Sequence, residues 1–150
     1  MARSPGASGP LLAGCCLAIM VALLVVGVVS HGVIRHIVQT APLWVAIVLG
    51  TRRSDLGKWA ALPSFVFWLL LIIAIWLFLL GWARIVSGTF TVTEIAMTIV
   101  VGAASTLGIV TGLRMRTATR RAVAVATVLG VTLLDLIAFR LSLLPAIAHR

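Results

Sequence analysis

Charged side chains are scarce in this sequence, and acidic ones are the scarcest. Of the 150 residues 10% are charged, and only three are acidic: Asp55, Glu94 and Asp135. Soluble domains carry about 25% charged residues. The apolar share is 62%, an excess that a water-soluble core of this size cannot bury. The shortage of charge excludes a soluble enzyme and the hydrophobicity excludes intrinsic disorder, so we expect an integral membrane protein.

Catalytic and metal-binding motifs are also missing. The two cysteines, Cys15 and Cys16, are adjacent, so there is no Cys-x-x-Cys pair, and the sequence has no Gly-rich phosphate loop and no Ser-x-x-Lys motif. His31 and His36 are five residues apart, a poor spacing for one ion shared on a helix. We predict no catalytic residue, no metal site and no cofactor. A haem axial ligand stays open as an alternative, because any intramembrane histidine could serve.

Basic residues, by contrast, are in excess, with 12 Lys and Arg residues and a net charge of +9. They gather in short tracts between apolar runs, where topology signals lie, so no nucleic-acid partner is expected. The two main tracts are Arg52, Arg53 and Lys58, and then Arg114, Arg116, Arg120 and Arg121. Cytoplasmic loops are enriched in Arg and Lys. Both tracts are therefore predicted to face the cytoplasm, with the N-terminus on the same side and the C-terminus outside.

Apolar runs of about 20 residues, the length that crosses a bilayer as a helix, fill most of the chain. Five runs qualify: 11–29, 33–50, 60–83, 93–113 and 122–144. They predict an all-α, polytopic transmembrane helix bundle, in which residues 1–150 form a single integral membrane domain with no soluble domain. Before the fourth run, Thr91 and Glu94 have the spacing of a capping box, which predicts a helix start there.

The run 33–50 is ambiguous, because polar residues and a proline interrupt its first half. The interrupting residues are Arg35, His36, Gln39 and Pro42. Four spans plus a re-entrant or interfacial segment are therefore an alternative to five spans. We favour five spans, because residues 41–50 are cleanly apolar, lead directly into a basic tract, and lack the amphipathic alternation of an interfacial helix.

Small residues at every fourth position predict where helices pack, because lipid gives little hydrophobic drive and close backbone approach matters. Three such ridges occur: Gly14, Ala18 and Ala22; Ala104, Gly108 and Gly112; and Ala122, Ala126 and Gly130. The run 60–83 carries large aromatic residues instead, including Phe65, Trp68 and Trp82. Bulky side chains all around this run suit a helix that faces lipid or docks another subunit.

Polar residues inside the apolar runs mark the candidate site. On a helix His31, Arg35 and Gln39 would share one face, although a simpler interpretation is a helix end whose Arg35 reaches lipid phosphate. A bare carboxylate in hydrocarbon costs at least about 2.5–3.5 kcal/mol, so we predict that Asp135 pairs with a cation of the second run. This pair would be a structural bridge or a proton or ligand site. The full intramembrane polar cluster is His31, Arg35, His36, Gln39, Glu94, Asp135 and Arg140.

These features predict a small, non-catalytic membrane protein. Its size and its aromatic third run favour a subunit or scaffold that binds membrane lipid, a membrane-protein partner or a second copy of itself. The alternative is a small transporter or a proton- or ion-conducting protein that uses the outer polar cluster, and a quinone- or haem-linked membrane enzyme comes third. An Arg-, Ala- and Val-rich chain without tyrosine, and without an organellar targeting peptide, suggests a bacterial inner membrane.

Overall fold

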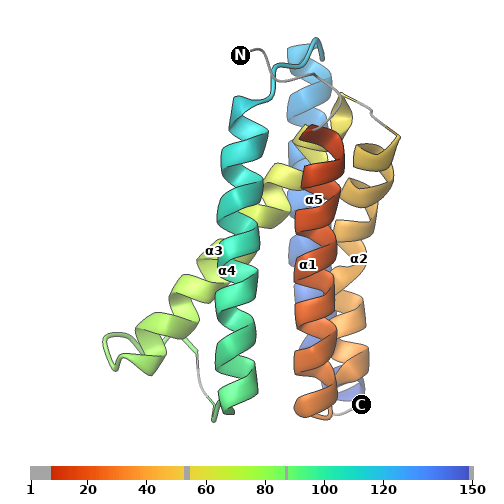
Figure 1. Cartoon of the computed structure of the whole chain (residues 1–150). Coiled ribbons are helices and arrows are strands. Elements are labelled where there is room, and N and C mark those ends of the chain that lie inside the picture. Colours follow the sequence, from red (N-terminus) through yellow and green to blue (C-terminus); the bar gives the residue numbers. More distant parts are fainter. Residues whose placement is uncertain (1–7, 53–54, 87, 149–150) are drawn as a thin grey trace.

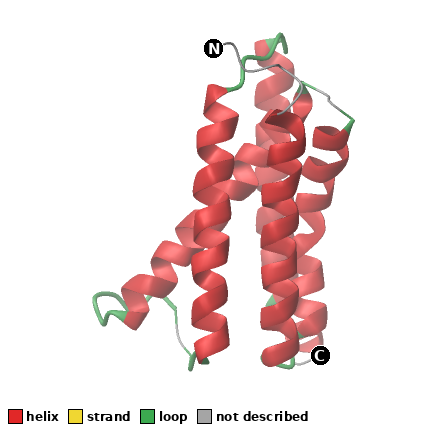
Figure 2. Cartoon of the chain, viewed as in Figure 1, coloured by secondary structure: helices red, strands yellow, loops and turns green. Residues whose placement is uncertain are grey.

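The structure, a computed structural model, describes residues 8–52, 55–86 and 88–148. All regular secondary structure in these ranges is helical (Figure 2). The helices are α1 (Ser8–Val29), α2 (Val33–Thr51), α3 (Leu56–Leu79), α4 (Val92–Arg114), α5 (Arg121–Ser142) and the short α6 (Pro145–Ala148). Helices α1 to α5 are each long and apolar enough to cross a membrane. The predicted all-α bundle with five candidate spans is therefore confirmed.

Helix α2 covers the whole of the ambiguous run. It is continuous from Val33 to Thr51, with Pro42 inside it, and it qualifies as a candidate span, so the short re-entrant alternative is not formed. Proline is tolerated in membrane helices when neighbouring groups satisfy the freed backbone atoms. Pro42 is itself buried, so it packs inside the bundle.

Helix α3 begins and ends four residues earlier than its apolar run predicts. The stop is Gly81, whose φ is 75°. The Gly81 N–H donates to the Phe78 carbonyl oxygen at 3.0 Å, and the Trp82 N–H donates to the Leu77 carbonyl oxygen at 2.9 Å. These two bonds form a Schellman motif, which ends a helix with a left-handed glycine. Apolar composition continues beyond Gly81, but the helix does not.

Helix α4 begins at the predicted capping box. The Glu94 N–H donates to the Thr91 hydroxyl at 3.2 Å, and the Thr91 N–H donates to Glu94 Oε2 at 2.6 Å. The two free N–H groups at the helix start are thus satisfied reciprocally, which confirms this prediction. The same bonds hold the Glu94 carboxylate in place near the start of α4.

Successive long helices run in opposite directions, so the bundle has two distinct ends (Figure 1). We call the end that holds the α2–α3 and α4–α5 connections the closed end, and the end that holds the α1–α2 and α3–α4 connections the open end. Both predicted arginine tracts belong to the closed end, although Arg53 lies outside the described residues. Helix α3 is tilted against the others, and its C-terminal half leans away from the bundle at the open end (Figure 1).

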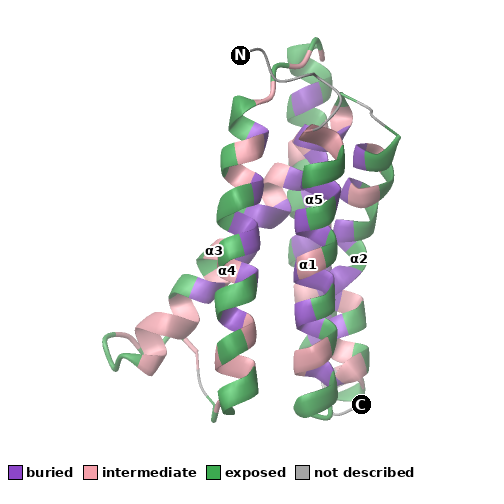
Figure 3. Ribbon diagram, in the orientation of Figure 1, coloured by how far each residue is buried: buried purple, intermediate pink, exposed green. Residues whose placement is uncertain are grey.

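The expectation that the run 60–83 faces lipid or docks another subunit does not hold for the buried face of its first half. Phe65 is fully buried and Trp68 is 5% exposed, and α3 contacts each of the other four long helices. Figure 3 shows this buried stretch where α3 crosses the bundle. The tilt explains the difference, because a crossing helix meets different neighbours along its length. The other face of α3 and its far end fit the expectation: Leu70 is 60% exposed, and Trp82, just beyond α3, is 77% exposed.

The three small-residue ridges have different surroundings. Along α4, Ala104, Gly108 and Gly112 are all buried, and a Cβ added at Gly112 would stand 2.8 Å from Leu62 Cδ2 of α3. On α1 the ridge is buried at Ala22, half-buried at Ala18 and exposed at Gly14. The α5 ridge of Ala122, Ala126 and Gly130 is exposed. Within this chain α5 turns a different face toward α2 and α3, so the packing predicted for the α5 ridge stays a prediction.

Candidate ligand-binding pocket

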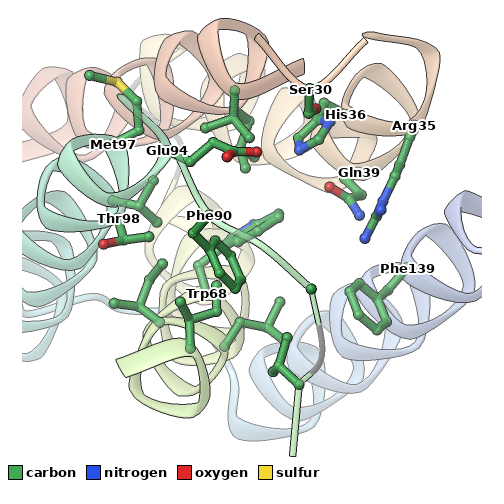
Figure 4. Close-up of a pocket in the computed structure, with 18 of the residues that line it drawn as sticks. Ser30, Arg35, His36, Gln39, Trp68, Phe90, Glu94, Met97, Thr98 and Phe139 are labelled. Atoms are coloured by element: carbon green, nitrogen blue, oxygen red, sulfur yellow. The ribbon is translucent and has the colours of Figure 1, made fainter. Parts of the chain in front are cut away.

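Four of the seven predicted polar residues line one pocket at the open end (Figure 4). Arg35, His36 and Gln39 come from α2, and Glu94 comes from α4. The pocket has a volume of about 380 Å³ and also receives side chains from α1, α3 and α5. The fold therefore brings together the polar stripe of the second span and the capping glutamate of the fourth, which are far apart in the sequence.

The other three predicted residues lie elsewhere. His31 is exposed in the turn between α1 and α2, with a φ of 56°, so it does not continue the helical stripe of Arg35 and Gln39. Arg140 is exposed on α5, and Asp135 is buried on α5. None of the three lines the pocket. His31 is left out of the predicted cluster because α2 begins after it, and Asp135 and Arg140 are left out because of how α5 is rotated.

Two of the pocket's polar residues on α2 already have partners. His36 Nδ1 donates to the Gly32 carbonyl oxygen at 2.9 Å. In a neutral ring this leaves Nε2 as an acceptor. Gln39 Nε2 donates to Ser142 Oγ at 2.9 Å, and this buried bond joins α2 to the end of α5. Gln39 therefore helps to hold the pocket's wall together.

Two buried donors that line the pocket lack partners. Arg35 Nε and Trp68 Nε1 are buried and have no hydrogen-bond partner among the described residues. Leaving a buried donor unsatisfied costs about 1–3 kcal/mol, so each such atom needs an explanation. Figure 4 shows the Arg35 guanidinium extending into the pocket between Gln39 and Phe139. Both side chains line the pocket, which makes them the candidate donors to a ligand with acceptor oxygens.

Apart from Ser30, Thr89 and Thr98, the remaining wall of the pocket is apolar. Helix α3 contributes Leu71, Ile72 and Ile75, and α4 contributes Met97 and Val101. Phe90, which precedes α4, lies over the pocket in Figure 4, and its ring centroid is 6.0 Å from that of Phe78. The pocket therefore has polar groups from α2 and α4 on some sides and hydrocarbon on the others.

Asp135 has a different partner from the one predicted. It is 2% exposed, and Ser64 Oγ of α3 lies 3.0 Å from Oδ2 and 3.2 Å from Oδ1, so the serine donates to the carboxylate. Within the described ranges no ion pair joins Asp135 to Arg35, and the predicted bridge to a cation of the second span is wrong. The reason is that the face of α5 bearing Asp135 meets the first half of α3.

Three residues of this region escaped the sequence analysis: Ser64, Trp68 and Ser142. Serine in a membrane helix commonly bonds its own backbone, as Ser142 Oγ also does to the Phe139 carbonyl oxygen at 2.7 Å, so its sequence position carries little signal. Trp68 was not distinguished from the other aromatic residues of its run. Among the described residues, no three His, Cys, Asp or Glu side chains come close enough to hold a metal ion.

No protein-family model, curated protein or solved structure matches this chain. A fold class alone does not assign a function. The function is therefore to be sought in the chemistry of the pocket and of the buried carboxylate.

Proposed function

We propose that this protein is a non-catalytic, multi-pass membrane protein that binds an amphipathic lipid through its open-end pocket. The observation that carries the proposal is the combination, in one cavity, of unpartnered polar donors and an apolar wall. Ligand pockets typically measure about 300–1,000 Å³ and are mostly apolar with a few placed polar groups. A volume of about 380 Å³ suits a headgroup and the first part of the acyl chains, while the rest of the lipid stays in the bilayer.

The distribution of basic residues supports one orientation of the bundle in the membrane. The arginine tracts at the closed end favour the cytoplasm for that end, so the pocket would open in the outer leaflet. We place the protein in a bacterial inner membrane on the basis of its composition. An accessory role beside a larger membrane protein fits the segment that follows α3, where Trp82 and Ile85 are exposed.

The proposal can be tested by measuring the lipid that stays bound. The protein would be purified in mild detergent and examined by native mass spectrometry, with Leu71→Trp to fill the pocket. The matched control is Leu70→Trp, because Leu70 lies next in sequence but is 60% exposed. We expect one retained lipid per chain in the wild type and the control, and its loss in Leu71→Trp with no change in the unfolding temperature. A wild-type protein that keeps no lipid would contradict the proposal.

A second candidate function, proton or ion conduction, is supported by Asp135. A carboxylate within a candidate membrane span is expensive and is a functional-site hypothesis by default, and Ser64 is its one hydrogen-bond partner among the described residues. The test is proton flux in liposomes that contain the wild type or Asp135→Asn. Flux that is abolished by Asp135→Asn, and not by Arg140→Gln, would favour conduction over lipid binding. Equal flux in all three proteins would remove this candidate.

A further inference from the structure

The pocket holds opposite charges that do not pair with each other. Arg35 and Glu94 both line it, yet no ion pair joins them in the part of the chain that the structure describes. Figure 4 shows the Glu94 carboxylate on the side of His36 and Ser30, while the Arg35 guanidinium lies across the pocket beside Phe139. Such a separation leaves a cationic side and an anionic side in one cavity. A ligand that carries both charges would complement it, whereas a purely anionic one would also face Glu94.

We propose that the pocket recognises a zwitterionic phospholipid with a primary ammonium group, placing the phosphate at Arg35 and the ammonium at Glu94. This inference rests on the proposed lipid-binding function and adds the headgroup class. It assigns a ligand role to two residues that sequence analysis could group only as part of a polar cluster.

On the cationic side, the available donors fit a phosphodiester. Arg35 Nε lacks a partner, and Trp68 Nε1 lacks one on a side chain that is only 5% exposed. Arginine binds phosphate oxygens through charge-assisted hydrogen bonds, which are roughly twice as strong as neutral ones. The phosphate and ester oxygens of a phospholipid offer acceptors to both donors. A hydrocarbon or an ammonium group at the same place would leave both donors unsatisfied, because neither has an acceptor.

On the anionic side, the available acceptors fit a primary ammonium. Glu94 Oε2 already accepts from the Thr91 N–H at 2.6 Å, but a carboxylate has about four lone-pair sites, so acceptor capacity remains. His36 Nε2 is a second acceptor on this side, because Nδ1 donates to Gly32. A primary ammonium has three N–H donors. A quaternary ammonium has no N–H group and cannot donate to either residue.

The experiment is a lipid competition read by native mass spectrometry. The full chain would be incubated with equimolar phosphatidylethanolamine, phosphatidylcholine and phosphatidylglycerol in detergent. We expect phosphatidylethanolamine to be enriched about tenfold over each competitor, the factor that a single charge-assisted hydrogen bond of about 1.5 kcal/mol gives. Free phosphoethanolamine should not displace the lipid, because it lacks the chains that contact the apolar wall. Displacement by it would identify a soluble ligand and overturn the proposal.

Two variants locate the recognition. Glu94→Gln keeps the capping geometry, because glutamine also serves in a capping box, but it should abolish the preference for phosphatidylethanolamine. Arg35→Gln should weaken the binding of all three phospholipids about tenfold or more. Arg140→Gln, at an exposed cation of α5, is the control and should change neither property.

The outcomes separate this inference from the function on which it rests. Lipid that binds with no headgroup preference, or with a preference that survives Glu94→Gln, overturns the headgroup assignment and leaves lipid binding intact. A chain that retains no phospholipid at all overturns both.

Discussion

The two ends of the bundle are built from the same five helices but differ in how closely those helices approach. At the closed end, a Cβ added at Gly57 of α3 would stand 2.9 Å from Gly50 Cα of α2, and one added at Gly108 of α4 would overlap the Phe65 ring of α3. At the open end, α3 leans away (Figure 1) and a cavity of about 380 Å³ remains between the helices.

The sizes of the side chains along α4 explain the difference. The buried residues nearest the closed end are Gly112 and Gly108, and those nearer the open end are Val101 and Thr98. Because small residues let helix backbones approach and larger ones hold them apart, the space between α3 and α4 widens along their length. Because side-chain size increases along the buried face of α4, the same helix forms a tightly packed end and an end with a cavity that can bind a ligand.

Polar side chains follow the same division. At the closed end Lys58 Nζ donates to the Met115 carbonyl oxygen at 2.7 Å, and Trp59 Nε1 donates to Thr117 Oγ1 at 3.2 Å. At the open end Arg35 Nε and Trp68 Nε1 lack partners within the described residues. Of the pocket's polar side chains, His36 and Gln39 are already satisfied by the chain, which leaves the Arg35 and Trp68 donors for a ligand.

The largest expected effect is that of Gly108→Leu at the closed end. The new side chain would overlap the Phe65 ring and force α3 and α4 apart, so we expect a loss of about 3 kcal/mol or more in the free energy of unfolding. Gly130→Leu is the matched control, because no atom lies within 4 Å of an added Cβ there. Thermal unfolding in detergent measures both. Equal unfolding temperatures would mean that the closed end is not tightly packed.

A smaller effect on the free energy of unfolding should follow from replacing a hydrogen-bonded cation, and a smaller one still from replacing an unpaired cation. Lys58→Met removes a hydrogen bond from a charged donor at the closed end, and it should lower the free energy of unfolding by about 1.5–3 kcal/mol. Arg35→Met removes a donor that lacks a partner, so in lipid-free detergent it should leave stability unchanged or raise it. Chemical denaturation compares the two. If Arg35→Met is the more destabilising, Arg35 stabilises the fold and the two ends do not differ in this way.

The coupling between Asp135 and Ser64 should be of intermediate size. Ser64→Ala removes the hydroxyl that donates to the carboxylate and should cost about 1–3 kcal/mol. A double-mutant cycle with Asp135→Asn should show coupling of at least about 0.5 kcal/mol, because the two groups are in contact. The cycle of Arg35→Gln with Asp135→Asn should be additive. Coupling in the second cycle alone would restore the ion pair that the structure replaces with Ser64.

The smallest expected effect concerns the helix start beside the pocket. Thr91→Ala removes the hydroxyl that accepts from the Glu94 N–H at 3.2 Å, and an N-cap loss of this kind costs about 1 kcal/mol. Thr93→Ala, two residues later and exposed, should cost less. Unfolding temperatures rank the two variants. The reverse ranking would show that the capping box does not stabilise α4.

Features that depend on local chemistry could be predicted from the sequence alone. Run length and composition are enough to identify five spans, because each membrane helix satisfies its own backbone hydrogen bonds. The capping box at Thr91 was likewise readable, since both of its partners lie within one turn. The Gly81 stop could have been read from the same kind of local signal. The shared face of Arg35 and Gln39 followed from helical periodicity once α2 was accepted as a helix, whereas His31, predicted on the same face, lies before the helix begins.

Which helix faces meet depends on the packing of the whole bundle and could not be predicted from the sequence. Ridges on α4 and α5 look alike in sequence, yet the first is buried and the second is exposed, because helix rotation depends on all neighbours at once. The partner of Asp135 is Ser64 of α3 rather than a cation. The tilt of α3 places Ser64 within reach of the carboxylate. The same tilt opens the pocket that brings Arg35, Trp68 and Glu94 into one cavity. Crossing angles arise from packing between residues far apart in the chain, which a local pattern does not encode.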